Sequence, residues 1–187
     1  MGLHGSRLFW HDEGYPLDLS HRLMTPRELK SHKTAPKYLK EIPTFKLQKR
    51  NKLPKPFKNL GGPRIESTGM IEVSADHVVF MFWRDGYILT DRSFYGYLFC
   101  RLANGSLSPI FEFHWHPSHK GFHCKMPCRT NNDYTNRNLP GAPELALKTK
   151  YDLDPKIHVD RLKLMIDFCR FCGISLPDND INSKPLW

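Results

Sequence analysis

Asn104-Gly105 is the feature that most constrains the fold, because it separates two runs of alternating aromatic and aliphatic residues. Asn-Gly readily supplies the two positive φ angles of a type I′ turn, which joins antiparallel strands through two residues. The sequence therefore predicts a β-hairpin with strands over 94–103 and 106–116. In this register the facing pairs are Ala103 with Ser106, Arg101 with Ser108, Phe99 with Ile110, Tyr97 with Glu112, and Tyr95 with His114.

Side-chain alternation divides this predicted hairpin into two faces. We expect the apolar face to pack on the core; it carries Phe94, Leu98, Cys100, Leu102, Phe111, Phe113 and Trp115. The opposite face gathers an arginine, a glutamate, two tyrosines and two histidines, which together could form an active site. Its members are Tyr95, Tyr97, Phe99, Arg101, Ile110, Glu112, His114 and His116.

Further strands are predicted on both sides of the hairpin. Residues 70–74 and 77–83 read as strands, and the apolar density of 78–83 favours a central strand buried on both faces. Asp85-Gly86 predicts a second tight hairpin leading into a strand over 87–90. With a last strand over 121–128, the chain forms an antiparallel meander.

A C-terminal helix should cover the core face of this sheet. Asp154 is a good N-cap, Pro155 suits the first helical position, and Gly173 ends the run. An apolar stripe recurs at helical spacing through Val159, Leu162, Met165, Cys169 and Cys172. Because Cys169 and Cys172 lie at the C-terminal end of this stripe, we interpret them as core residues and not as a redox pair. The predicted fold class is therefore α+β.

The positive charge is concentrated in the first third of the chain. Residues 1–64 hold 14 Lys and Arg against 5 Asp and Glu, whereas residues 65–187 hold 14 of each kind. The same 64 residues contain seven of the fifteen prolines. We therefore predict a basic, proline-rich extension over 1–64, with a short helix over 26–32 capped by Thr25 and Glu28, before a globular domain over 65–187.

The densest basic run, Lys46–Lys58, contains no acid. It is interpretable either as a solvated, flexible tail or as an electrostatic arm that binds phosphate backbones. In the second case the substrate-binding residues include Lys49, Arg50, Lys52 and Lys55. We expect no membrane partner, because no amphipathic apolar face accompanies the charge and no apolar run approaches the ~20 residues of a membrane span.

The cellular compartment is predicted from the cysteines and the N-terminus. The five cysteines are odd in number and form no even framework, which suits a reducing cytoplasm. The first residues contain no apolar core of signal-peptide length. We therefore expect a cytoplasmic protein.

Four of the ten histidines lie within ten residues: His114, His116, His119 and His123. Histidine can accept and donate protons near neutral pH, and arginine binds phosphate oxygens through two parallel hydrogen bonds. We predict that His114 and His116 share proton transfers, with Glu112 as orienter or base and Arg101 on a scissile phosphate. Tyr95, Tyr97, His119 and His123 would contact substrate. Such a face could cleave RNA without a metal cofactor.

Two alternatives remain open at this point. The same histidines are zinc-compatible ligands, so His114, His116 and His119 could form the site of a zinc- or manganese-dependent nuclease or hydrolase. The other alternative is a non-catalytic nucleic-acid-binding protein in which the basic arm is the functional element and the histidines are incidental.

The stretch over about 87–128 resembles the TumE-like toxins of bacterial toxin–antitoxin pairs. The resemblance lies in Tyr95-Gly96-Tyr97, the tight turn at Asn104-Gly105, and the histidine-rich segment from His114 to His123. Those toxins typically have Asp-Asn after the second strand, where this chain has Glu112-Phe113-His114. The resemblance implies a small α+β fold, ribonuclease activity and an antitoxin partner.

Overall fold

The computed structural model describes residues 25–53, 57–117, 121–125 and 153–177. Their centre is a six-stranded antiparallel sheet whose strands follow one another in chain order. These strands are β2 (Lys46–Leu47), β3 (Ile65–Glu72), β4 (His77–Arg84), β5 (Ser93–Arg101), β6 (Leu107–His116) and β7 (Gly121–Lys125). The predicted α+β meander is therefore confirmed.

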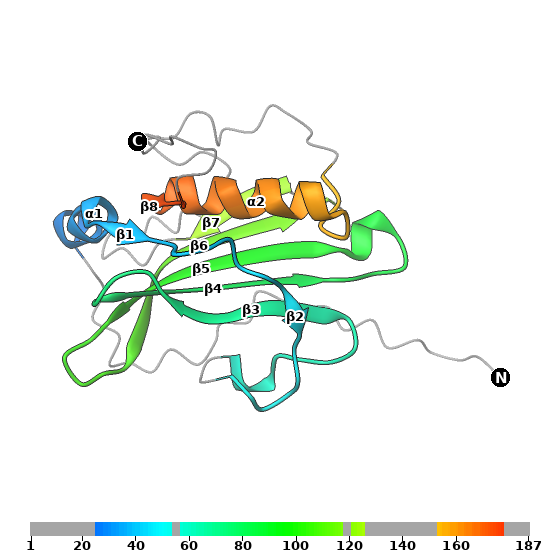
Figure 1. The fold of residues 1–187 in the computed structure, drawn as a ribbon, viewed down its shortest axis with the longest axis horizontal. Helices are drawn as coiled ribbons and strands as arrows, with labels where there is room; N and C mark the ends of the chain where they lie inside the picture. The colour runs from blue at the N-terminus through cyan, green and yellow to red at the C-terminus, as the bar shows by residue number, and fades with distance from the viewer. Residues whose placement is uncertain (1–24, 54–56, 118–120, 126–152, 178–187) are drawn as a thin grey trace.

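Within the described part of the chain, two α-helices accompany the sheet: α1 (Pro26–Thr34) and α2 (His158–Phe171). Figure 1 shows α2 lying across one face of the sheet, while the loop that carries the short 3₁₀ helix η1 (Phe57–Asn59) lies on the opposite side. The two-residue strands β1 (Lys37–Tyr38) and β8 (Ile174–Ser175) pair in parallel and join the two ends of the described chain.

The predicted first helix is confirmed together with its cap. The Thr25 hydroxyl accepts a hydrogen bond from the backbone N–H of Glu28 at 3.2 Å, and the Glu28 carboxylate accepts the backbone N–H of Thr25 at 2.7 Å. This reciprocal capping box satisfies two N–H groups that the first turn leaves without helical partners.

The start predicted for α2 was wrong by about a turn. The helix begins at His158, with Ile157 as its N-cap. The Asp154 carboxylate instead accepts the backbone N–H of Lys156 in a preceding turn and pairs with the guanidinium of Arg92. As a result Val159, which was predicted to lie on the apolar stripe, is 70% exposed.

The face of α2 that meets the sheet is otherwise as predicted: Met165, Cys169 and Cys172 are buried. Phe168 lies directly over Gly96 of β5, where an added Cβ would stand 2.6 Å from the phenyl ring. Glycine at this position therefore lets the helix approach the strand closely. The resulting core includes Phe94, Leu98, Phe111, Phe113, Trp115 and the α2 side chains.

The β5–β6 hairpin keeps part of its predicted register and loses part. Tyr95 faces His114 and Tyr97 faces Glu112, as predicted. Nearer the turn, however, Phe99 faces Pro109 and Arg101 faces Leu107, because a bulge follows Leu98. The pairs predicted there were wrong, and Ile110 is buried in the core on the α2 side.

The turn itself explains the shift. Among its residues only Gly105 has a positive φ, +79°, and Leu102 N–H donates to the Ser106 carbonyl across the loop. This is a three-residue loop with glycine in the left-handed position, and not the predicted type I′ turn. The loop shifts the register by one residue and the bulge restores it further along.

The predicted hairpin at Asp85-Gly86 was also wrong. Residues 85–92 form a longer connection that contains the 3₁₀ helix η2 (Leu89–Asp91). Arg92 holds this connection, since its guanidinium donates to the carbonyl of Gly86 and lies 3.5 Å from the Asp85 carboxylate. The prediction for β4 is confirmed: all its residues except the terminal Arg84 are buried.

A second hydrophobic core lies on the sheet face opposite α2. The buried side chains come from the sheet and from the basic segment: Leu53, Phe57, Ile65, Val78, Phe80, Phe82, Tyr97 and Phe99. The ring of Phe57 lies 4.7 Å from that of Phe80 and 4.8 Å from that of Tyr97, between centroids. The described part of the predicted extension thus contributes a layer of the fold, across the boundary expected at residue 64.

Candidate functional site

Part of the β5–β6 face that was predicted to carry the active site is covered by another segment of the chain. Tyr97 and Phe99 are buried beneath Phe57, so they contribute to the second core. The cover comes from a loop closed by backbone hydrogen bonds, in which Asn51 N–H donates to the Lys58 carbonyl and Gly62 N–H donates to the Gln48 carbonyl. Tyr97 is therefore a wall of the core and not an exposed platform for a nucleobase.

A cluster of polar side chains lies on the same face next to that core. Nε2 of His114 lies 3.3 Å from Oε2 of Glu112, two residues earlier on β6. The ring of Tyr95 contacts both histidines, with centroids 4.9 Å from His114 and 5.2 Å from His116. The structure therefore brings together four predicted site residues: Tyr95, Glu112, His114 and His116.

These four side chains differ in exposure. His114 is only 7% exposed, whereas His116, Glu112 and Tyr95 are half-buried. Burial raises the pKa of the Tyr95 phenol, although a hydrogen bond with Ser93 and the charge of Arg84 act in the opposite direction. Tyr95 is therefore a neutral hydroxyl group at physiological pH. The site combines a buried imidazole beside a carboxylate with a more accessible imidazole.

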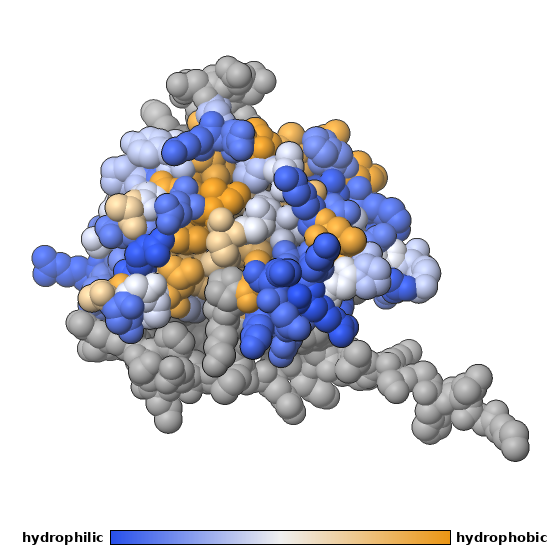
Figure 2. Space-filling view, turned by 60° about the horizontal axis from the view of Figure 1, so that its bottom comes forward, coloured by the Kyte–Doolittle hydropathy of each residue, from blue (hydrophilic) through white to orange (hydrophobic). Residues whose placement is uncertain are grey.

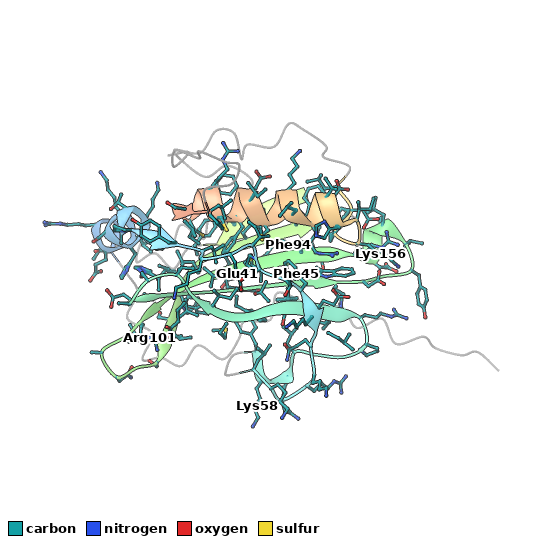
Figure 3. All side chains as sticks on the ribbon, in the orientation of Figure 1. Glu41, Phe45, Lys58, Phe94, Arg101 and Lys156 are labelled. Carbon is teal, nitrogen blue, oxygen red and sulfur yellow. The ribbon has the colours of Figure 1, made fainter. Side chains whose placement is uncertain are left out.

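Arg101 does not join this cluster. Its guanidinium donates to the carboxylate of Glu72 at 2.8 Å, near the hairpin end of the sheet (Figure 3). Arg101 lies four residues along β5 from Tyr97, the partner of Glu112, and this spacing corresponds to roughly 13 Å of strand. The predicted alignment of arginine, glutamate and imidazoles is therefore not present.

Arg84 is the cation that the sequence reasoning missed. It ends β4 opposite Ser93 of β5, and alternation places it on the same face as Phe80 and Phe82 of the second core. Its charge acts on the phenol of Tyr95. The same period-2 pattern that identified the β4 strand could have found it, because positions 80, 82 and 84 share a face.

The other predicted substrate-binding residues fall in three groups. His123 is the backbone partner of His114 on β7, while His119 and Lys55 lie outside the described residues. Lys49, Arg50 and Lys52 are exposed on the loop around η1. Hydrophilic residues gather over this loop beside a more hydrophobic strip in Figure 2, and Lys58 projects away from the sheet in Figure 3.

One of the three ligands of the metal alternative, His119, lies outside the described residues. Within residues 25–53, 57–117, 121–125 and 153–177, no group of three or more His, Cys, Asp or Glu is arranged to hold a metal ion. The four described cysteines are free thiols. Burial raises the pKa of Cys169 to about 12, which suppresses thiolate and agrees with its predicted role in the core.

No protein-family model, curated protein or solved structure matches this chain. The resemblance to TumE-like toxins therefore stays a prediction from residues 87–128. In the described part of the chain, no helix is both long enough and apolar enough to cross a membrane.

Proposed function

We propose that this protein is a metal-independent endoribonuclease. The observation that carries the proposal is the 3.3 Å contact between Glu112 Oε2 and His114 Nε2, with Tyr95 and His116 beside it. Two imidazoles at one site can divide the roles of general base and general acid. A carboxylate 3.3 Å from a ring nitrogen stabilises the positive charge that this ring carries after it has taken up a proton.

The chemistry uses the substrate's own nucleophile. His114 or His116 removes the proton from a 2′-hydroxyl group, and the oxygen attacks the adjacent phosphorus. The new O2′–P bond forms as the P–O5′ bond breaks, and the other histidine protonates the departing 5′-oxygen. The products are a 2′,3′-cyclic phosphate and a 5′-hydroxyl end.

Arg84 takes the phosphate-binding role that the sequence assigned to Arg101. A guanidinium cannot lose its proton at physiological pH and donates in a planar fork, so it stabilises the extra charge on a pentacoordinate phosphorus. The Tyr95 hydroxyl, kept neutral by its raised pKa, can donate to the same oxygens. Positioning by Glu112 and charge stabilisation by Arg84 are separable by mutation.

The basic loop attracts RNA electrostatically and so raises the affinity of the protein for it. Lys49, Arg50 and Lys52 are exposed on a segment that also carries Lys46 and Lys58, without a nearby acid in the sequence. Contacts of this kind neutralise phosphates and release counterions, so the affinity for RNA should fall steeply with salt. The contribution adds affinity without sequence preference.

The test is cleavage of end-labelled RNA in excess chelator. We expect cleavage that leaves a 2′,3′-cyclic end, and a loss of at least 100-fold in each of His114→Ala and His116→Ala. His158→Ala, which removes an exposed histidine at the start of α2, serves as the matched control. Equal activity in all four proteins would remove the two β6 histidines from the mechanism.

Chelator sensitivity separates the metal alternative. Activity that disappears in chelator and returns with zinc or manganese would favour a site using His114, His116 and His119. Stoichiometric metal in the purified protein would point the same way.

A non-catalytic RNA-binding protein is the second candidate, and the exposed cations of the η1 loop favour it. Replacement of Lys49, Arg50 and Lys52 by Ala should weaken RNA binding and flatten its salt dependence in either case. RNA binding that is lost in this triple variant, in a protein that never cleaves RNA, would decide for the binding protein.

The resemblance to TumE-like toxins supports the same reaction and adds a partner. On that basis we propose a cytoplasmic toxin neutralised by an antitoxin. Co-expression with the product of the adjacent gene should relieve growth arrest caused by the active protein, and should have no effect on cells expressing His114→Ala. Growth that is unaffected by the active protein would argue against the toxin role while leaving the ribonuclease proposal in place.

A further inference from the structure

α1 meets the end of the sheet through two histidine rings. Nδ1 of His32 lies 3.1 Å from Nε2 of His77, the first residue of β4. The rings meet edge to face, with centroids 5.2 Å apart. On its other side the His77 ring is fixed by Ser74, whose Oγ lies 2.8 Å from Nδ1. At this distance one of the two facing nitrogens donates its N–H and the other accepts it.

A buried cation stands next to this pair. Lys37 is almost completely buried, and its ammonium donates to the carbonyls of His32, Lys33 and Ala35 at 2.7, 2.9 and 2.7 Å. A cation on the last carbonyls of a helix stabilises that helix end. The ammonium also makes any further positive charge on the two neighbouring rings unfavourable.

The charges that act on the pair come from each of the elements around it. His32 experiences Lys37, Asp76 and Glu28, and His77 experiences Lys37, His32 and Asp76. Asp76 and Glu28 favour protonation, but Asp76 is exposed in the β3–β4 turn and therefore screened by water. Cys100, the β5 partner of His77, is a buried neutral thiol whose pKa is raised by burial.

We propose that the His32–His77 contact is a proton-sensitive latch, which holds α1 on the sheet at neutral pH and releases it in acid. Protonation of both rings would place two N–H donors and two positive charges face to face beside Lys37. Neither ring can then accept the hydrogen bond that joins them. Separation of α1 from β4 lets water solvate both charges.

The pKa values of the two rings are shifted in the direction that the latch requires. Burial, then Lys37, then His32 lower the pKa of His77 from 6.5 to about 4, and burial followed by Lys37 lowers the pKa of His32. Because the closed state resists protonation, the free energy by which the rings favour it over the open state is fully present above pH 6.5. It is lost as the pH falls towards 4. For His77 alone, the opening equilibrium should rise about 20-fold between pH 7 and pH 5.

The release should be local. The segment after α1 is held by the parallel pairing of Lys37 with Ile174 and of Tyr38 with Ser175, whose backbone hydrogen bonds do not titrate. The core under α2 contains no ionised group at these pH values among the side chains of its buried cluster. Opening confined to one element is the expected behaviour of a low-stability unit at a structure's edge.

Hydrogen exchange of the full chain tests the latch. Exchange of the 26–34 amides, corrected for intrinsic rates, should become about 20-fold faster relative to the 158–171 amides on passing from pH 7 to pH 5. His77→Gln, which cannot gain a proton in this range, should abolish most of that change, whereas the exposed control His158→Gln should retain it. Equal protection of α1 at the two pH values, or an unchanged response in His77→Gln, would overturn the proposal.

A second measurement avoids any loss of folding in the variant. The ring signals of His77 in the unmodified protein should titrate with a midpoint below pH 5.5. The midpoint should coincide with the loss of protection in α1. A midpoint above 5.5, or a ring that titrates while α1 stays fully protected, would refute the latch.

Discussion

The two faces of the sheet are covered in different ways. On one face α2 lies across β4, β5 and β6 and buries a continuous apolar surface around Phe168. On the other face a loop rich in lysine and proline covers only part of the strands, through Leu53 and Phe57. Beyond the reach of that loop, the same face carries the half-buried Glu112 and His116 and the buried His114. Alternation determines which residues share a face, but only the covering segment determines which of them become core.

This contrast locates the candidate site. His114 is buried next to Tyr97, with ring centroids 5.7 Å apart, so the second core forms one wall of the polar cluster. A hydrophobic wall excludes water from one side of the imidazole and strengthens its interaction with Glu112. The site thus lies at the border between a covered and a less covered part of one sheet face.

The largest expected effect is on the α2 face. Phe168→Ala should lower the free energy of unfolding by about 4 kcal/mol, because a fully buried ring is lost and a cavity remains. Urea unfolding measures the change, and Val159→Ala on the exposed side of the same helix should alter it by less than about 0.5 kcal/mol. Similar effects for the two variants would contradict the observed packing of α2.

The next largest effect is expected on the opposite sheet face, which the η1 loop covers. Phe57→Ala should cost about 3 kcal/mol, since the ring contacts Phe80, Tyr97 and Phe99 and is buried. The exposed Lys58→Ala, one residue further on, provides the control. If the loop were a loose arm, as one interpretation of the sequence allowed, Phe57→Ala would be as mild as its control.

A smaller effect probes the closeness of α2 to β5. Gly96→Ala should destabilise by about 2 kcal/mol, because the new Cβ meets the Phe168 ring and must displace it. The double variant with Phe168→Ala should be less destabilised than the sum of the two single changes, since the clash disappears. Additive losses would show that Gly96 matters for another reason.

Much of the fold could be predicted from alternation and period. The run from Val78 to Trp83 is apolar throughout and identified the central strand, and Thr25 with Glu28 identified the start of α1. The errors came from sequence motifs that are compatible with two different local structures. Asn-Gly fits both a two-residue loop and a three-residue loop with glycine in the left-handed position. Asp154 can cap a helix or close the turn before it.

The sequence could predict which site residues share a face and lie opposite each other on neighbouring strands, but not which of them a distant segment would bury. The alternation on β5 and β6 correctly paired Tyr95 with His114 and Tyr97 with Glu112. It could not show that Phe57, from a basic segment forty residues earlier, would bury Tyr97, because a long-range contact leaves no local period. Arg101 was assigned to the site because it shares the face, although its distance along the strand already separated it from Glu112.

The smallest expected effect distinguishes the two arginines of the loop face. Arg101→Gln should change stability by less than about 0.5 kcal/mol, because its partner Glu72 is largely exposed and such surface pairs contribute little. It should also leave RNA cleavage unchanged within a factor of about two, since the guanidinium lies at the hairpin end of the face. Arg84→Gln, a matched removal of charge next to Tyr95, should lower cleavage at least tenfold, because it takes a cation from the scissile phosphate. Cleavage that follows Arg101 and ignores Arg84 would move the site along β5, away from the pair of Glu112 and His114.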